Sequence, residues 1–199
     1  MNKSIIGIDE AGRGPLAGPV AVGAACVPKG FDWKMIPGVN DSKKLSAKNR
    51  EAIFMRAREL QKEGKLEYSV SMVSAPVIDK IGIAPAVRLG IKRCFNKLDK
   101  NPKTVSVKLD GLLYAPEEYL EQETITKGDQ KEKIIGLASI MAKVTRDRYM
   151  VKIAKEYPKY SLEIHKGYGT KVHRGAISKY GLSKIHRAYF CKNILNNKI

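Results

Sequence analysis

Residues 5–15 read Ile-Ile-Gly-Ile-Asp-Glu-Ala-Gly-Arg-Gly-Pro, and the rest of the chain is organised around them. The apolar run 5–8 predicts a buried strand, and Asp9 and Glu10 follow it directly. Side chains alternate along a strand, so these two acids meet at one point only if the strand ends or twists there. The glycines that follow allow such a bend and leave main-chain N–H groups open to a phosphate or a sugar hydroxyl. Taken alone, an Asp-Glu pair more often marks only an acidic strand end before a tight turn.

Length and composition indicate a globular protein of one domain, or one domain with a modest appendage. The 199 residues are enough for a sizeable core, and a hydrophobic content of 43% is ordinary. No apolar run reaches membrane-spanning length and no signal-peptide pattern opens the chain, so we expect no membrane contact and a cytoplasmic location. The three cysteines lack the spacing of a disulfide framework or a zinc site.

The charge balance points to a polyanionic partner. The chain has 37 Lys and Arg against 20 Asp and Glu, a net charge of +17. Nucleic acid is favoured over an anionic membrane because no basic amphipathic anchor stands out. Binding through such charges should weaken steeply with salt. A non-catalytic nucleic-acid binder would share this balance, so charge alone does not indicate an enzyme.

Strands mixed with helices predict an α/β domain with a mixed β-sheet flanked by helices. Hydrophobic periodicity and turn residues predict strands over 4–9, 20–27, 66–73, 104–109 and 123–126, the first two as a hairpin. They predict helices over 46–63, from 74 through 98, over 133–157 and over 170–179. We expect a catalytic domain over 1–157 and a small C-terminal helical appendage over 158–199.

Two further acids follow predicted strands and lie beside glycines: Asp110 before Gly111, and Asp129 after Gly128. The carboxyl ends of strands are where α/β proteins place ligand-binding groups, although Asp-Gly is also an ordinary turn signal. Clustering Asp9, Glu10 and these acids costs free energy unless a cation neutralises them. Oxygen ligands without His or Cys suit Mg²⁺ or Mn²⁺, and two such ions can promote phosphodiester hydrolysis. Spacing alone leaves open whether the four acids converge.

The chain resembles the type 2 ribonuclease H family (ribonuclease HII) in motifs that occur in family order over nearly its whole length. The motifs are Asp9-Glu10-Ala11-Gly12-Arg13-Gly14-Pro15, Asn40-Asp41-Ser42-Lys43, Asp110-Gly111, Lys127-Gly128-Asp129, Ala138-Ser139-Ile140, Ala142-Lys143-Val144, Arg146-Asp147 and His165-Lys166-Gly167-Tyr168. Sister type 3 enzymes carry Lys between the two glycines, so Arg13 favours type 2. The resemblance implies a ribonuclease H-like fold. It also implies cleavage of the RNA strand of RNA/DNA hybrids and incision 5′ of single ribonucleotides in duplex DNA, leaving 3′-hydroxyl and 5′-phosphate ends.

The resemblance also implies roles for individual residues. The catalytic and metal-binding carboxylates would be Asp9, Glu10, Asp110 and Asp129, holding two Mn²⁺ or Mg²⁺ ions with substrate bound. The main chain of Gly12, Arg13 and Gly14 would read the ribose 2′-hydroxyl, the group that distinguishes RNA from DNA. Tyr168 would pack on the sugar of the following nucleotide. Phosphate contacts are expected from Lys43, Lys44, Lys143, Arg146, Lys166 and Lys171.

Other residues are given structural or peripheral roles. Asp147 lies between Arg146 and Arg148, which favours an ion-paired structural role over a fifth catalytic acid. For His165 and His173 we expect loop phosphate contacts or exposure and assign no catalysis. We expect a monomer without a sliding-clamp contact, because the chain ends soon after the appendage. Two alternatives stay open: a basic nucleic-acid binder, and a DNA-cutting ribonuclease H-like protein such as an integrase or resolvase.

Overall fold

The structure is a computed structural model, and it describes residues 4–39 and 45–196. A five-stranded sheet forms its centre, in the order β3-β2-β1-β4-β5. The strands are β1 (Ser4–Ala11), β2 (Val20–Pro28), β3 (Glu67–Val73), β4 (Val105–Asp110) and β5 (Gln122–Ile125). The longer helices are α1 (Ala47–Lys62), α3 (Ile83–Leu98), α5 (Lys133–Ala154), α7 (Lys171–Tyr180) and α8 (Ala188–Asn196). The shorter ones are α2 (Ala75–Ile81), α4 (Gly128–Lys131), α6 (Leu162–His165) and the 3-10 turns Trp33–Met35, Pro102–Thr104 and Pro158–Tyr160.

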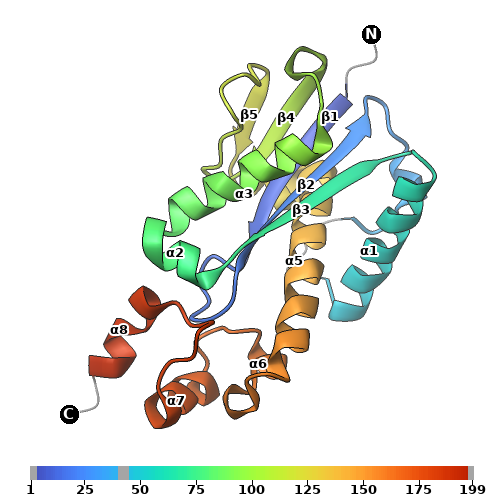
Figure 1. Cartoon of the computed structure of the whole chain (residues 1–199). Helices are drawn as coiled ribbons and strands as arrows, with labels where there is room; N and C mark the ends of the chain where they lie inside the picture. Colours follow the sequence, from blue (N-terminus) through green and yellow to red (C-terminus); the bar gives the residue numbers. More distant parts are fainter. Residues whose placement is uncertain (1–3, 40–44, 197–199) are drawn as a thin grey trace.

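The sheet is mixed, as predicted. β1 pairs antiparallel with β2, which pairs antiparallel with β3, while β4 runs parallel to both β1 and β5. The carboxyl ends of β1 and β4 therefore lie at the same end of the sheet, the end at which α6, α7 and α8 are found (Figure 1). Groups placed at these two strand ends are thus brought close together.

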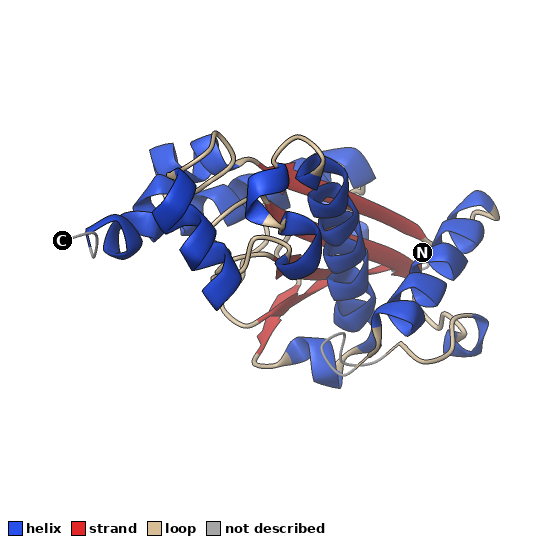
Figure 2. Ribbon diagram, turned by 90° about the horizontal axis from the view of Figure 1, so that it is seen from below, coloured by secondary structure: helices blue, strands red, loops and turns tan. Residues whose placement is uncertain are grey.

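Helices cover both faces of the sheet (Figures 1 and 2). On one face α2 and α3 pack on the strands and bury a core that includes Ile8, Val22, Ile91 and Leu109. On the other face α1 and α5 enclose a second core, which includes Phe54. The flanking helices predicted from the sequence are confirmed, although α5 is buried on all sides over residues 134–142 rather than along one apolar stripe. No helix of the described ranges is both long and apolar enough to cross a membrane.

Two strand glycines let α5 approach the sheet closely. A β-carbon at Gly7 would lie 2.4 Å from the carbonyl oxygen of Ile134, and one at Gly23 would lie 2.2 Å from that of Ala138. Real side chains do not tolerate such distances, so larger residues would push the helix away. This close approach sets the first turns of α5 directly behind the acidic end of β1.

Several helix and strand boundaries in the structure differ from those predicted from the sequence. The sequence predicted one helical stretch over residues 74–98. The structure has two helices there, because Gly82 has φ 85° and separates α2 from α3. α5 ends at Ala154, before the predicted stop at 157. The strand β1 continues through Glu10 to Ala11, paired with β2, whereas the sequence predicted an end at Asp9. The turn at 128–131 forms α4, which the sequence analysis did not predict.

The prediction that His165 and His173 are exposed or contact phosphate is wrong. Both are buried in a cluster with His186, where the rings of His165 and His173 stack with centroids 4.3 Å apart. Their sequence neighbourhood is basic and rich in glycine, which is typical of a loop. The helices of the C-terminal segment nevertheless fold over these rings and exclude solvent.

The hydrogen bonds of this cluster define neutral tautomers for all three rings. Carbonyl oxygens only accept, so His173 Nδ1 donates to Tyr168 O (2.9 Å) and its Nε2 is left to accept from His186 Nε2 (3.1 Å). The remaining Nδ1 of His186 accepts from Ser183 N at 2.9 Å. His165 Nε2 likewise donates to Tyr160 O (2.8 Å). Protonating His173 or His186 would put two N–H groups against each other.

We expect this cluster to make the protein less stable below neutral pH. Burial lowers the pKa of His173 and of His186 to about 4, well below the ordinary 6.5. Between these values the unfolded chain binds more protons, so the free energy of unfolding falls as pH drops from 6.5 toward 4, by on the order of 1–2 kcal/mol per histidine. Thermal melts of wild type and His186→Asn at pH 7 and 5 test this. The variant keeps an acceptor for Ser183 N, so its melting temperature should fall distinctly less between pH 7 and pH 5 than that of wild type. An equal fall in both proteins would contradict the role given to His186.

Candidate active site

A cleft of about 570 Å³ opens at the carboxyl ends of β1 and β4. The predicted acids, glycine loop and tyrosine are eight residues, and seven of them line this cleft. They are Asp9, Glu10, Gly12, Arg13, Gly14, Asp110 and Tyr168. Arg50, Ser139 and Lys143 also line it, and the sequence analysis assigned no site role to the first two. The cleft thus joins acids, glycine loop and tyrosine from three distant parts of the chain.

Asp9 and Glu10 border one cleft although they alternate on β1. The pairing of β1 with β4 ends at Ile8, opposite Leu109, so the edge of β1 beyond Ile8 is open on that side. Side chains from both faces of β1 can then reach the same space. The sequence analysis required β1 itself to end or twist; instead, the neighbouring strand ends first.

Burial and like charge act together on these two acids. Burial raises the pKa of Asp9 well above its ordinary value, and the charges of Glu10 and Asp110 add to the rise, against a hydrogen bond from Ser139. Burial also raises the pKa of Glu10, although Arg13 Nη1 lies 3.2 Å from Glu10 Oε1 and opposes the shift. Groups with raised pKa values in a cleft are typical of functional sites.

Asp110 ends β4 and connects the cleft to α4. Its Oδ1 accepts from Gly128 N at 2.6 Å and lies 3.4 Å from Asp129 N. Asp129 is buried, with 2% of its surface exposed, and is not among the residues that line the cleft. The structure therefore brings Asp9, Glu10 and Asp110 together, and places Asp129 next to Asp110 through its main chain.

These acids fit a divalent cation of the Mg²⁺ class. Asp9, Glu10 and Asp110 offer only carboxylate oxygens, and a cation would offset the repulsion that raises the pKa of Asp9. Within the described ranges no three His, Cys, Asp or Glu side chains lie so that they could hold a metal ion by themselves. An ion at these acids would need further ligands, and Mg²⁺ and similar ions keep several waters and take further oxygens from substrate phosphates.

The loop that follows β1 is shaped by two buried arginines. Gly12 has φ 85°, and a β-carbon there would lie 2.0 Å from Arg146 Nε. The guanidinium of Arg187 donates to Gly12 O (2.6 Å) and Arg13 O (2.8 Å). The sequence analysis missed Arg187, and no local signal marks it, because these partners lie 174 and 175 residues away in the chain.

Tyr168 reaches the cleft from the C-terminal segment. It is 40% exposed, and its ring centroid lies 5.4 Å from Lys143 Nζ and 5.6 Å from Arg146 Cζ. A cation that lies over an aromatic ring is attracted to its face, and this attraction restricts the orientation of the Tyr168 ring. The carbonyl of Tyr168 accepts a hydrogen bond from His173 Nδ1. The ring is thus fixed and still available to a ligand.

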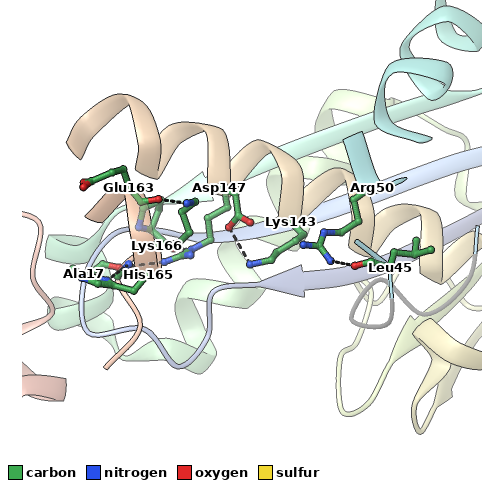
Figure 3. Close-up of polar contacts among 11 residues, drawn as sticks. Ala17, Leu45, Arg50, Lys143, Asp147, Glu163, His165 and Lys166 are labelled. Atoms are coloured by element: carbon green, nitrogen blue, oxygen red, sulfur yellow. Dashed lines mark hydrogen bonds and ion pairs between the residues drawn. The ribbon is translucent and has the colours of Figure 1, made fainter. Parts of the chain in front are cut away.

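The basic residues that the sequence predicted to contact phosphate lie in different environments. Lys43 and Lys44 lie outside the described residues. The prediction that Arg146 contacts phosphate is wrong, because its side chain is fully buried and donates to the carbonyls of Ala17 and Pro19. Lys143 pairs with Asp147 at 3.0 Å on α5 (Figure 3), so the structural ion pair predicted for Asp147 is present, with a lysine as partner.

The other candidates for phosphate contact lie in the C-terminal segment. Lys166 donates to Glu163 O near the start of the C-terminal helices (Figure 3), and Lys171 is exposed at the beginning of α7. Neither is among the residues that line the acidic cleft, whereas Arg50 and Lys143 are. Arg50 of α1 also donates to Leu45 O at 2.5 Å.

Comparison with known proteins gives one consistent result. The family model for ribonuclease HII matches residues 6–193. The chain is 48% identical to the ribonuclease HII of Caldicellulosiruptor bescii over 194 residues, which are 98% of this chain and 89% of that protein. It is 45% identical to that of Endomicrobium trichonymphae over 190 residues, which are 94% of this chain and 84% of that protein.

Solved structures show the same fold. The RNase HII in the PCNA:RNase HII complex from Archaeoglobus fulgidus superimposes with a TM-score of 0.74 at 24% identity, covering 96% of both chains. Bst-RNase HIII in complex with Mn²⁺ gives a TM-score of 0.75 at 17% identity, covering 99% of this chain and 70% of that chain. These likenesses confirm the ribonuclease H-like fold expected from the sequence. Taken with the family match and the close relatives, they lead to one conclusion: this chain belongs to the ribonuclease HII family.

Proposed function

We propose that this chain is a divalent-metal-dependent endoribonuclease that cuts the RNA strand of RNA/DNA hybrids. We propose further that it incises on the 5′ side of single ribonucleotides in duplex DNA and leaves 3′-hydroxyl and 5′-phosphate ends. One observation carries the proposal: Asp9, Glu10 and Asp110 share a cleft with the glycine loop and Tyr168. Membership of the ribonuclease HII family supports the reaction class.

The acids are proposed to hold the cations and the attacking water. Asp9, Glu10 and Asp110 would hold one ion, and Asp129 with Asp9 a second once substrate is bound. A divalent cation held by these carboxylates would stabilise charge on the phosphate and would make water a better nucleophile near neutral pH. The Mn²⁺ complex of Bst-RNase HIII supports an ion of this kind, Mn²⁺ or Mg²⁺.

The glycine loop and Tyr168 are proposed to select the position of the cut. The bare main chain of Gly12, Arg13 and Gly14 would contact the ribose 2′-hydroxyl, and the Tyr168 ring would pack on the next sugar. Residues 158–199 would form a small subdomain that completes the substrate groove, since Tyr168 projects from it into the cleft. Lys43 is proposed as a phosphate contact on sequence grounds alone.

Two further questions concern protein partners: a sliding clamp and a second copy of this chain. The Archaeoglobus relative assembles with PCNA, which leaves a sliding-clamp contact open for this chain. A monomer is proposed on sequence grounds alone.

The decisive assay compares two duplexes that differ by one 2′-hydroxyl. We expect the strand with a single ribonucleotide to be cut at that position with Mg²⁺ or Mn²⁺, and the all-DNA strand to stay intact. Chelating the metal should stop the reaction, because the acids cannot by themselves stabilise phosphate charge. No cleavage by folded protein with either ion would refute the proposal. Equal cleavage of both duplexes would favour an integrase-like or resolvase-like activity.

A further inference from the structure

The buried side chain of Arg187 gathers carbonyls of the loop that joins β1 to β2. Its Nη2, Nη1 and Nε donate to the carbonyls of Gly12 (2.6 Å), Arg13 (2.8 Å) and Gly18 (3.0 Å). The side chain is fully buried. Within the described ranges no carboxylate forms an ion pair with it. Backbone carbonyls therefore satisfy this buried cation, and the fixed planar fork of the guanidinium sets where each of the three carbonyls lies.

Holding these carbonyls fixes the direction of two N–H groups. The peptide bonds of the described residues are all trans, and in a trans peptide the C=O and the following N–H point in opposite directions. With the carbonyls of Gly12 and Arg13 turned toward Arg187, the N–H groups of Arg13 and Gly14 are turned away from it. Both residues line the cleft and are exposed. Neither N–H donates to an acceptor within the described part of the chain.

The same C-terminal segment also aligns the loop with Tyr168. Arg187 N donates to Leu16 O at 2.7 Å, and Gly18 N donates to Ile185 O at 2.8 Å. From the other side, Leu16 N donates to Gly167 O at 2.8 Å, directly before Tyr168. The loop is thus held between the segment that carries Arg187 and the segment that carries the tyrosine.

We propose that Arg187 is a positioning residue for ribose selection: it holds the Gly12 and Arg13 carbonyls so that the N–H groups of Arg13 and Gly14 face the substrate's 2′-hydroxyl. This inference rests on the proposed function. A misplacement of about 1 Å in such a group costs on the order of 10²-fold in rate. Lysine keeps the charge but not the planar fork, so Arg187→Lys separates the two contributions.

The test uses Arg187→Lys and Arg187→Gln, with Asp79→Asn as the matched control. Asp79 accepts from Ala188 N (2.7 Å) and Tyr189 N (3.2 Å), so Asp79→Asn weakens the hold on the start of α8 and removes a negative charge that acts on Arg187, while the hydrogen bonds from Arg187 to the loop carbonyls keep their donors and acceptors. Each variant is assayed at a temperature where circular dichroism shows it to be folded. We expect both Arg187 variants to lose about 10²-fold in kcat/KM on the single-ribonucleotide duplex. Affinity for all-DNA duplex should stay unchanged, and Asp79→Asn should resemble wild type.

A binding readout separates positioning from general loosening. In an Asp110→Asn background, which blocks the cut, the ratio of affinities for ribonucleotide and all-DNA duplexes should fall to near one when Arg187→Lys is added. The NMR signals of the Arg13 and Gly14 backbone amides in the folded wild type give a second measurement. They should shift when the ribonucleotide duplex is added and not when the all-DNA duplex is added. Folded Arg187 variants with wild-type preference would overturn the inference alone, as would unshifted amides. A wild type that does not prefer the ribonucleotide duplex would overturn the proposed function, and this inference with it.

Discussion

Asp110→Asn should lower the cleavage rate by roughly 10³-fold, the loss expected when several kcal/mol of charge stabilisation at the phosphate are removed. The folded structure should survive, because an asparagine oxygen can still accept from Gly128 N, as Asp110 Oδ1 does at 2.6 Å. Removing one negative charge also relieves the repulsion that raises the pKa of Asp9 and of Glu10. Affinity for the duplex should therefore be kept or strengthened, and only turnover should be lost.

The matched control is Glu123→Gln, an exposed acid on β5 that makes the same change in net charge. Single-turnover cleavage and duplex binding are measured for wild type and both variants. Glu123→Gln should cut like wild type. A folded Asp110→Asn that cuts within a few-fold of wild type would remove the acids from the mechanism. Equal losses in both variants would assign the effect to overall charge, as expected of a basic nucleic-acid binder.

Adding a single methyl group should mainly lower stability at Gly12 and mainly lower activity at Gly14. At Gly12 it would lie 2.0 Å from Arg146 Nε, on a backbone with φ 85°. The strained backbone and the overpacking together should cost about 2–5 kcal/mol. For a protein of this length that lowers the melting temperature by about 5–20 °C. Gly12→Ala should therefore be chiefly a stability variant, with activity lost along with the fold of the loop.

Gly14→Ala should leave stability almost unchanged. Nothing lies within 4 Å of a β-carbon at this position, which lines the cleft. The methyl group would stand where the sugar approaches, so kcat/KM on the single-ribonucleotide duplex should fall by about 10-fold, equivalent to about 1.4 kcal/mol. Thermal melts and cleavage assays of both variants check the pair. An unchanged melting temperature for Gly12→Ala would contradict the packing on Arg146, and full activity of Gly14→Ala would mean that the loop does not contact substrate.

The central features of the fold could be predicted because their signals are local. The apolar runs before Asp9 and Asp110, and the glycines after them, mark strand ends within a few residues of chain. Parallel pairing of β1 with β4 then brings these acids to one end of the sheet. The motif order added the loop and Tyr168, which spacing alone did not connect to the acids.

Other features could not be predicted because they depend on contacts between distant segments. Arg146 and Arg187 are charged residues in a basic sequence, and a solvent-exposed position is the ordinary expectation for such residues. Their burial follows from carbonyls of the β1–β2 loop that lie 127 to 175 residues away. His165 and His173 were misplaced for the same reason, since His186, from beyond α7, completes their cluster.

The position of the metal tests the central claim most directly. We suggest an anomalous-scattering map at the manganese edge, from crystals of the Asp129→Asn variant and of the wild type grown with Mn²⁺ and an uncleavable duplex carrying one ribonucleotide. We expect wild-type peaks between Asp9, Glu10 and Asp110, beside the phosphate next to the ribose, and loss of a second peak in the variant. Manganese bound only elsewhere, with the duplex in place and these carboxylates vacant, would contradict it.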